Sequence, residues 1–484
     1  MTQKEALDIL KTGRNVFLTG AAGSGKTHTL REYISYLRGI NASVAVTAST
    51  GIAATHMGGV TIHSWSGIGI KDFLHPYEIE TIIEKSYIRN RLRNTSVLII
   101  DEVSMLHHFR LDIIDEILKQ ARVSTEPFGG MQVVLCGDFF QLPPIGKRKE
   151  SEQDDESSAA FAFDKSFSEP REARKKFAYH ARSWDNLGLK VCYLLEQHRQ
   201  EDQKYLKVLN AIRDNTVEDE IIEILNERTN VVISNTASPT RLYSHNVDVD
   251  AENERELKKL PGEIFSYEME SRGKRPLVES LKKSCLAPET LRLKKGAKVM
   301  FVKNNFDEGF VNGTQGVVEF LNHETIMVKA SSGRVINVPF ESWRIDEDGK
   351  AKAEIAQYPL RLAWAITVHK SQGMSLEAAE IDLRDCFEKG MGYVALSRVR
   401  SLSGLSLKGF NNIALCVDDG VLEYDRKLRK SSEISKSQIK KLGPRIFTMH
   451  SEFKNKISVS KLQKSEPKNE KKKKKKFKHS YYYQ

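Results

Sequence analysis

Eight residues near the start of the chain have the types and the spacing of a phosphate-binding loop. An apolar run, Val16–Thr19, leads into them, and a stretch with helical character, Thr29–Leu37, follows. Glycines let backbone N–H groups approach phosphate oxygens, and the start of a helix adds partial positive charge. The pattern G-x-x-x-x-G-K-T therefore predicts a bound nucleoside triphosphate. Its members are Gly20, Ala21, Ala22, Gly23, Ser24, Gly25, Lys26 and Thr27, with His28 directly after them.

Side chains in and near this loop have predicted roles toward the nucleotide. Lys26 is expected to reach the β- and γ-phosphates, and the hydroxyl of Thr27 is expected to bind Mg²⁺. A nucleoside triphosphate and Mg²⁺ are therefore the ligands that this motif predicts. Gln3 belongs to a predicted amphipathic helix before the first strand. Its amide can hydrogen-bond an adenine edge, whereas periodicity alone favours an ordinary surface residue that faces solvent.

Polar side chains also end two further buried strands. Val97–Ile100 runs into Asp101 and Glu102, and the carboxyl ends of parallel strands face the ligand crevice in α/β folds. Asp101 is expected to hold Mg²⁺, and Glu102 is expected to act as general base on the attacking water. The strand Met131–Cys136 leads to Gln141, which can sense the γ-phosphate and couple hydrolysis to movement.

The elements that position these residues belong to a chain of 484 residues, long enough for several domains. No apolar run approaches the roughly 18 residues of a membrane span, and the N-terminus lacks a signal-peptide core. Five scattered cysteines form no C-x-x-C pair, so neither a zinc site nor a disulfide framework is indicated. We expect an intracellular protein without a membrane partner, cytoplasmic in a prokaryote or virus and nuclear in a eukaryote.

Positive charge is concentrated at the C-terminus. The net charge is +11, and residues 461–484 alone hold ten lysines and two glutamates. The unbroken run Lys471–Lys476 repels itself, which predicts disorder. Such a tail can clamp nucleic acid, direct nuclear import or keep the protein soluble, and the residues favour none of these. The rest of the chain is only mildly basic, so the total charge says little about nucleic-acid binding by the folded part.

Alternating strands and helices predict an α/β fold with parallel sheets. The pattern breaks over Leu291–Val338, where short strands and the hairpin signal Asn312-Gly313 indicate a small β module. The α/β pattern resumes over Leu362–Leu376 and Gly392–Arg400.

As a set, the motifs resemble the petite-integration-frequency (PIF) DNA helicases of superfamily 1. The resemblance is carried by residues 111–144, LDIIDEILKQARVSTEPFGGMQVVLCGDFFQLPP, and by the two closing motifs at 362–376 and 392–400. It covers most of residues 1–410. It implies ATP-dependent movement in the 5′ to 3′ direction along single-stranded DNA and unwinding of duplex or structured DNA.

The resemblance also implies an architecture of two RecA-like motor domains with an inserted SH3-like β module. The expected boundaries are 1–188 for the first domain, with a small insertion at about 66–94 and a polar loop at 146–160, then 189–295 and 358–425 for the second domain, 296–357 for the β module, and 426–484 for a basic, mostly disordered tail.

Further site residues follow from the resemblance alone. Arg199 and Arg398 are expected to reach the phosphates as arginine fingers, although His198 stands where the family usually has an aromatic residue. Gln372 and Gly373 are expected near the nucleotide. Loops of both domains are expected to contact DNA phosphates and sugars with little sequence preference, through Thr50, Gly51, His63, Ser64, His369, Lys370 and Ser371.

The expected partners are single-stranded DNA and its junctions with duplex DNA, engaged by a monomeric motor. Two other functions stay open: a DNA-stimulated ATPase that acts as a switch or scaffold without unwinding, and an RNA-directed helicase. The residues identify no protein partner. They do not choose among DNA repair, recombination, replication and telomere maintenance.

Overall fold

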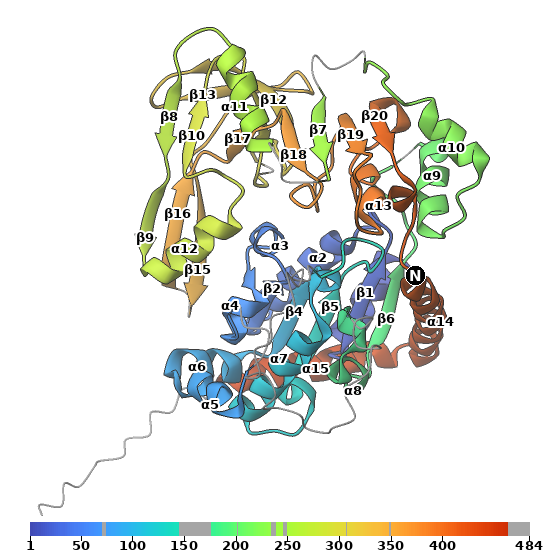
Figure 1. The fold of residues 1–484 in the computed structure, drawn as a ribbon. Helices are drawn as coiled ribbons and strands as arrows, with labels where there is room; N and C mark the ends of the chain where they lie inside the picture. The colour runs from blue at the N-terminus through green and yellow to red at the C-terminus, as the bar shows by residue number, and fades with distance from the viewer. Residues whose placement is uncertain are drawn as a thin grey trace, which may run out of the picture.

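Two α/β domains face each other in the computed structural model (Figure 1). A β module lies beside the second domain, and two long C-terminal helices lie along the first. The predicted α/β fold with parallel sheets and an inserted β module is confirmed. The structure describes residues 1–69, 74–144, 176–200, 202–233, 239–244, 249–305, 307–347 and 350–462.

The first domain is built on a six-stranded parallel sheet in the order β3-β2-β4-β5-β1-β6. Every residue of β1, β4 and β5 is buried, as continuous apolar runs predict for strands covered on both faces. The strands are β1 (Val16–Gly20), β2 (Val44–Ala48), β3 (Val60–Thr61), β4 (Val97–Asp101), β5 (Gln132–Cys136) and β6 (Lys190–Leu194).

Alternate strand residues face two separate apolar cores, one on each side of this sheet. One core contains side chains of α1 (Gln3–Lys11) and α2 (Lys26–Gly39). Helices α5 to α8 contribute to the other. The remaining helices are α3 (Gly51–His56), α4 (Ile62–Ser66), α5 (Pro76–Glu84), α6 (Ser86–Asn94), α7 (His108–Arg122) and α8 (Arg182–Asn186), with short 3-10 turns at Val103–Met105, Pro127–Gly130 and Ala178–His180.

The second domain has a four-stranded parallel sheet in the order β18-β7-β19-β20. Its strands are β7 (Thr240–Tyr243), β18 (Ala365–Thr367), β19 (Ala379–Leu383) and β20 (Leu405–Phe410). Its helices are α9 (Gln203–Arg213), α10 (Asp219–Asn226), α11 (Val249–Lys259) and α13 (Met391–Leu396), with 3-10 turns at Leu402–Gly404 and Asn412–Leu415.

The β module is antiparallel and has cores of its own. Its main sheet has the order β14-β13-β12-β11-β17, and the rings of Phe301 and Phe310 stack inside it with centroids 4.2 Å apart. Its elements are β8 (Phe265–Glu268), β9 (Glu270–Gly273), α12 (Arg275–Ser284), β10 (Thr290–Leu293), β11 (Lys298–Phe301), β12 (Gln315–Leu321), β13 (Ile326–Ala330), β14 (Val335–Asn337), β15 (Glu341–Glu347), β16 (Lys350–Gln357) and β17 (Leu360–Leu362).

Helices α14 (Asp419–Leu442) and α15 (Arg445–Leu462) form what we call the C-terminal arm. Helix α14 packs along β6, where the hydroxyl of Ser432 accepts a hydrogen bond from the backbone N–H of Tyr193 at 3.1 Å. Helix α15 adds Phe453 and Ile457 to the core beneath α1 and α2. This corrects the expectation of a mostly disordered tail from residue 426, because α14 and α15 extend to residue 462 and pack against the rest of the protein. Residues 463–484, including the lysine run, lie outside the described part.

Two expected boundaries also shift. Strand β6 pairs with β1, so the first sheet extends past residue 188. The β module begins near residue 265 rather than 296, because β8 pairs with β10 and β9 pairs with β16. A strand's partner is set by tertiary pairing, which local pattern does not reveal. The predicted polar loop at 146–160 lies outside the described residues.

Candidate active site

A cavity of about 900 Å³ lies between the two α/β domains and reaches the β module. The phosphate loop, the end of β4, the segment after β6 and the closing motifs of the second domain all contribute to its lining. Residues that are far apart in sequence therefore meet at one site. Its lining includes Ala22, Gly23, Gly25, Lys26, Thr27, His28, Asp101, Glu102, Gln141, Arg199, Gln372, Gly373 and Arg398, all predicted from sequence.

The phosphate loop joins β1 directly to α2, as its motif predicts. Gly25 has φ +86°, a left-handed conformation that favours glycine, and the side-chain amide of Gln3 lies against its Cα. Lys26 begins α2, and its Nζ donates to the carbonyls of Gly20 at 2.8 Å and Ala21 at 3.0 Å. Gln3 is thus placed at the loop by its own contacts rather than facing away from it.

The two carboxylates stand at the end of β4, beside the loop. Asp101 is 7% exposed, and one of its carboxylate oxygens accepts a hydrogen bond from the backbone N–H of Glu102 at 2.9 Å. Glu102 has a left-handed backbone, with φ 51° and ψ 43°. Burial, followed by the neighbouring charge of Asp101, raises the pKa of Glu102 to about 7. Burial also raises the pKa of Asp101.

Arg199 follows β6, Arg398 follows α13, and both line the cavity together with the phosphate loop. The guanidinium of Arg199 donates to the carbonyl of Ser397 at 3.0 Å. Arg398 is 1% exposed, and its Nε donates to the carbonyl of Val394 at 2.9 Å. Burial and then the charge of Arg398 lower the pKa of Arg199 to about 9. Two cations, one half-buried and one buried, are therefore held close together, an arrangement suited to a polyanionic ligand.

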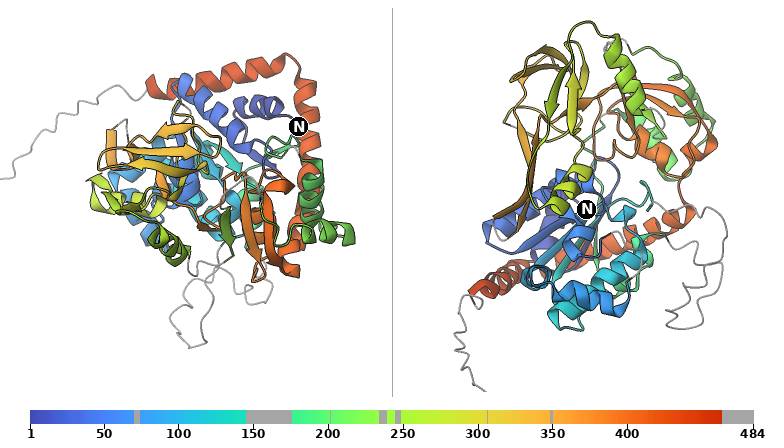
Figure 2. Two further views of the ribbon diagram at one scale, coloured as in Figure 1. Left: turned by 90° about the horizontal axis from the view of Figure 1, so that it is seen from above. Right: turned by 60° about the vertical axis from the view of Figure 1, so that its left-hand side comes forward.

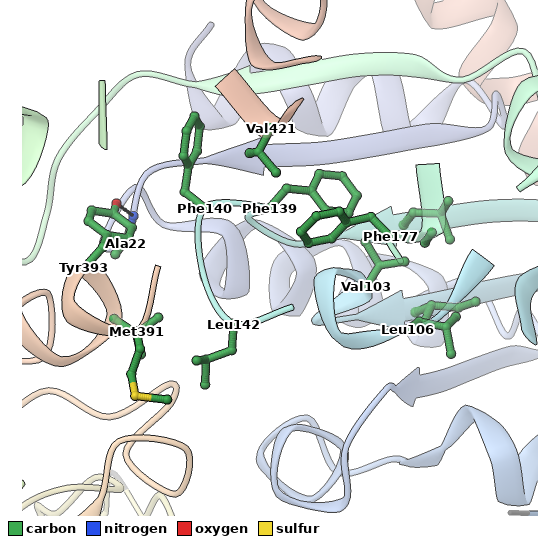
Figure 3. Close-up of a cluster of buried hydrophobic side chains, with 14 of the residues drawn as sticks. Ala22, Val103, Leu106, Phe139, Phe140, Leu142, Phe177, Met391, Tyr393 and Val421 are labelled. Carbon is green, nitrogen blue, oxygen red and sulfur yellow. Dashed lines mark hydrogen bonds between the residues drawn. The ribbon is translucent and has the colours of Figure 1, made fainter. Parts of the chain in front are cut away.

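A buried ionic network that sequence reasoning missed connects the domains. Asp138 follows β5, and both of its carboxylate oxygens accept hydrogen bonds from Arg213 of α9 at 2.9 Å. Arg213 also donates to the hydroxyl of Tyr393, which accepts a further bond from the backbone N–H of Ala22 at 3.1 Å. Figure 3 shows Tyr393 reaching this loop residue, with Phe140 nearby. Burial alone would raise the pKa of Asp138, but Arg213 holds it below its usual value.

Gln141 belongs to the same segment as Asp138. It is 6% exposed, lines the cavity, and its amide donates to Asp138 at 3.3 Å. A residue of the cavity lining is thereby linked to the interdomain network. The G-D-x-x-Q spacing shows that the two side chains are close, but not that Asp138 pairs with an arginine 75 residues away.

The predicted DNA-contact residues divide into three groups. Thr50, which caps α3 through a bond from the N–H of Ala53, lines the cavity together with His369 and Lys370, and Gly51 directly follows Thr50. His63 and Ser64 lie outside the cavity lining. The His63 ring contacts Arg110, and the carbonyl of Ser64 accepts from Arg91. The Ser371 hydroxyl is fully buried and donates to the carbonyl of Val368 at 2.7 Å, so its side chain does not reach the cavity.

One buried atom of the cavity lining fits a phosphate ligand. The amide nitrogen of Gln372, which lines the cavity, has no hydrogen-bond partner among the described residues. The hydroxyl oxygen of Ser24 is also unpaired there, but Ser24 is not among the residues that line the cavity. A buried polar atom costs free energy unless it is paired, which is expected where a ligand completes the site. For Mg²⁺ the loop hydroxyl of Thr27 and the carboxylate of Asp101 offer oxygen donors of the type that this ion prefers. The described residues contain no cluster of three or more His, Cys, Asp or Glu side chains suited to a metal.

The phosphate loop belongs to one parallel sheet, and the two arginines that face it are hydrogen-bonded to the domain of the other parallel sheet. This arrangement defines a two-domain RecA-like nucleotide-dependent motor. A family model described as PIF1-like helicase matches residues 2–221, and one described as DNA helicase Pif1, 2B domain, matches residues 276–321, within the β module. The chain belongs to the PIF1-like helicase family.

Individual relatives agree with this assignment. ATP-dependent DNA helicase Pif1 of Psychrobacter sp. (strain PRwf-1) is 42% identical over 542 residues, which cover 98% of this chain and 78% of that protein. ATP-dependent DNA helicase PIF1 of Homo sapiens is 33% identical over 90% of this chain, which spans 64% of the human protein.

Solved structures share the fold. Pif1 from Bacteroides sp in complex with ADP-AlF4 has a TM-score of 0.75 at 31% identity, covering 88% of this chain and 96% of that one. Bacteroides Pif1 bound to ssDNA has a TM-score of 0.58 at 31% identity, with 89% and 97% covered. Within the described residues, no helix is long and apolar enough to cross a membrane.

Proposed function

We propose that this protein is an ATP-driven DNA helicase that moves 5′ to 3′ along single-stranded DNA and opens the duplex ahead. The convergence of Arg199 and Arg398 on the phosphate loop of the facing domain carries the proposal, because it couples the nucleotide to the separation of two domains. Both arginines and the loop belong to one chain. The site is therefore complete in a single molecule, which supports a monomeric motor.

Nucleotide binding begins at the phosphate loop. Backbone N–H groups and Lys26 hold the phosphates. The side chain of Gln3 reads the base, and its contact with Gly25 supports this role. Thr27 and Asp101 would hold Mg²⁺, which neutralises charge on the phosphate oxygens when bound.

Hydrolysis uses the groups around the terminal phosphate. Glu102 accepts the proton of the attacking water as general base. Arg199 and Arg398 stabilise the negative charge that develops on the transferred phosphoryl group. Gln141 orients the water or senses the γ-phosphate, and its bond to Asp138 transmits the change toward α9.

Movement follows from the position of the arginines. ATP favours the closed arrangement because only that form places both arginines on its phosphates, and product release removes this attraction. Thr50 of the first domain and His369 and Lys370 of the second line the space between the domains, and Gly51 directly follows Thr50, so each domain can hold a strand in turn. Alternate gripping moves the protein along the strand, mainly through backbone contacts.

The test is strand separation by the full chain with ATP and Mg²⁺, on one partial duplex with a 5′ single-stranded tail and one with a 3′ tail. We expect unwinding of the 5′-tailed substrate only, and Lys26→Ala should be inactive on both. Unwinding of the 3′-tailed duplex would overturn the direction. Stimulated ATP hydrolysis without strand separation would favour a switch, and preferential stimulation by RNA would favour an RNA-directed motor.

A further inference from the structure

We propose that the C-terminal arm, α14 and α15, is a second DNA-binding surface that holds the phosphate backbone of duplex DNA outside the cleft. The inference rests on the proposed function in that it takes DNA as the ligand of this protein. It concerns a surface that the nucleotide cavity does not include, since no arm residue is among those that line the cavity.

The distribution of charge is the first support. The arm, residues 419–462, contains 11 lysines and arginines and 5 acidic residues, and residues 463–484 after it add 9 lysines and 2 acidic residues. The first 418 residues thus hold 55 basic and 57 acidic side chains, and the motor itself is slightly acidic. A protein with this balance gains little long-range attraction to DNA from its motor domains. The excess of positive charge is in the C-terminal part.

The second support is that the arm's cations are available. Seven exposed basic residues of α14 and α15 make no salt bridge within the part of the chain that the structure describes, whereas Lys427, Arg429 and Lys436 pair with acidic neighbours. A surface cation without an acidic partner can release counterions when it meets a phosphate. The seven are Arg426, Lys430, Lys440, Lys441, Arg445, Lys454 and Lys456.

The shape of the arm selects the kind of ligand. At 1.5 Å per residue, the 24 residues of α14 and 18 of α15 extend for about 36 and 27 Å. Figure 2 shows the two helices meeting at one corner of the first domain, away from the β module. The cations lie along two rods and do not converge on a pocket, which favours an extended polyanion over a small phosphate.

Rigidity favours duplex DNA among extended polyanions. The apolar side of the arm is anchored, through Val421 and Leu428 on α14 and Phe453 and Ile457 on α15. The row of cations is therefore fixed in space, and duplex DNA offers a similarly stiff row, with one charge per about 1.7 Å of axis. The proposed function places single-stranded DNA between the two α/β domains. The arm lies on the outer surface of the first domain, where duplex DNA can bind at the same time.

The experiment compares two full-chain triple variants that remove equal charge. Lys430, Lys440 and Lys441 of the arm are changed to Gln in one, and three exposed lysines elsewhere, Lys258, Lys295 and Lys329, in the matched control. Each protein is first saturated with a short single-stranded oligonucleotide and a non-hydrolysable ATP analogue. Binding of a labelled blunt duplex is then measured across a salt series.

We expect the wild type and the control to bind the duplex with the same salt dependence. In the arm variant the slope of log affinity against log salt should fall by about 2 to 3, because up to three phosphate contacts are lost. Stimulation of ATP hydrolysis by saturating oligonucleotide should be equal in all three proteins, which shows that they are folded. An unchanged slope in the arm variant, or an equal loss in the control, would overturn the proposal.

The outcome for the arm is separable from the proposed function. Duplex binding needs no ATP hydrolysis, so a protein that binds the duplex through its arm but separates no strands would retain this inference and lose the helicase proposal. A helicase whose arm variant binds the duplex as the wild type does would give the reverse result.

Discussion

Arg398 occupies its place because three bonds within the second domain hold its guanidinium and neighbouring backbone. Besides the bond to Val394, its Nη2 donates to the hydroxyl of Ser397 at 2.8 Å, and its backbone carbonyl accepts from the N–H of Leu376. The charge is thus positioned before any ligand arrives, and such preorganisation is what makes an arginine effective toward a developing phosphoryl charge.

Arg398→Ala should lower DNA-stimulated ATP turnover by about 10³-fold or more, with a smaller effect on ATP affinity. The reason is that the guanidinium acts on charge that develops in the transition state. Turnover and nucleotide affinity are measured separately, alongside Arg384→Ala, which removes an exposed arginine of the same domain. Equal losses of turnover and affinity would indicate that Arg398 is structural.

The contacts of some site residues could be predicted from the sequence, and those of others could not. Lys26, Asp101 and Glu102 could be predicted because a few neighbouring residues define their motif and its geometry. Arg213 could not, because Tyr393, one of its partners, is 180 residues away and only the folded chain brings them together. Ser371 shows the opposite case, since its motif is recognisable but its buried hydroxyl is used locally.

Helix α9 is tied to both domains by Arg213. The Arg213 side chain is 3% exposed and forms an ion pair with the buried carboxylate of Asp138. Its guanidinium carbon lies 4.0 Å from the ring centroid of Phe140. Removing one member of a buried ion pair leaves the other charge unpaired and typically costs about 3–5 kcal/mol. Arg213 is therefore an ionic anchor of α9, in addition to the buried side chains of this helix that belong to the apolar core.

We expect Arg213→Met to lower the free energy of unfolding by about 3–5 kcal/mol, measured by denaturant titration. Lys207→Met on the same helix removes an exposed pair with Glu220 and should cost less than about 1 kcal/mol. Adding Asp138→Leu to Arg213→Met should restore part of the loss, because no charge then remains buried alone. A double variant no more stable than the single one would show that the pair is not the source of the effect.

Helix α14 is not expected from the sequence because most of the residues on its buried face are polar. The buried face of α14 is formed by Val421, Asp425, Leu428, Ser432 and Ser435. The spacing is helical, but three of these five residues are polar, so hydrophobic periodicity is too weak to show the helix. Asp425 is satisfied by Arg429 of its own helix at 2.6 Å, and Ser432 by a backbone group of β6.

At the scale of the whole molecule, His56 marks where three parts meet. Its ring Nε2 lies 2.8 Å from the side-chain nitrogen of Asn312 in the β module, and Gly373 of the second domain is beside it. Burial, followed by the charge of Arg31, lowers the pKa of His56 to about 4. The ring is therefore neutral at pH 7 and accepts a hydrogen bond from the amide of Asn312.

Because the folded pKa lies below the unfolded value near 6.5, this contribution to stability is present above pH 6.5 and is lost as the pH falls toward 4. The slope should approach about 1.4 kcal/mol per pH unit, the value for one proton. Denaturant unfolding from pH 7 to 5 measures it, and His56→Gln should remove this part of the dependence. A variant with the same pH profile as the wild type would assign the titration to other groups.

The first domain is completed by two distant stretches of the chain, since α14 covers β6 only after the whole second domain and β module have been made. A ribosome adding roughly 5–20 residues per second needs roughly 10 to 45 seconds to synthesise residues 195–418. During that time the edge of β6 lacks its cover, and the N–H of Tyr193 lacks the hydroxyl of Ser432. An uncovered strand edge pairs readily with other chains. In the interval between the synthesis of β6 and that of α14, the nascent first domain is therefore exposed to edge-to-edge pairing with other chains.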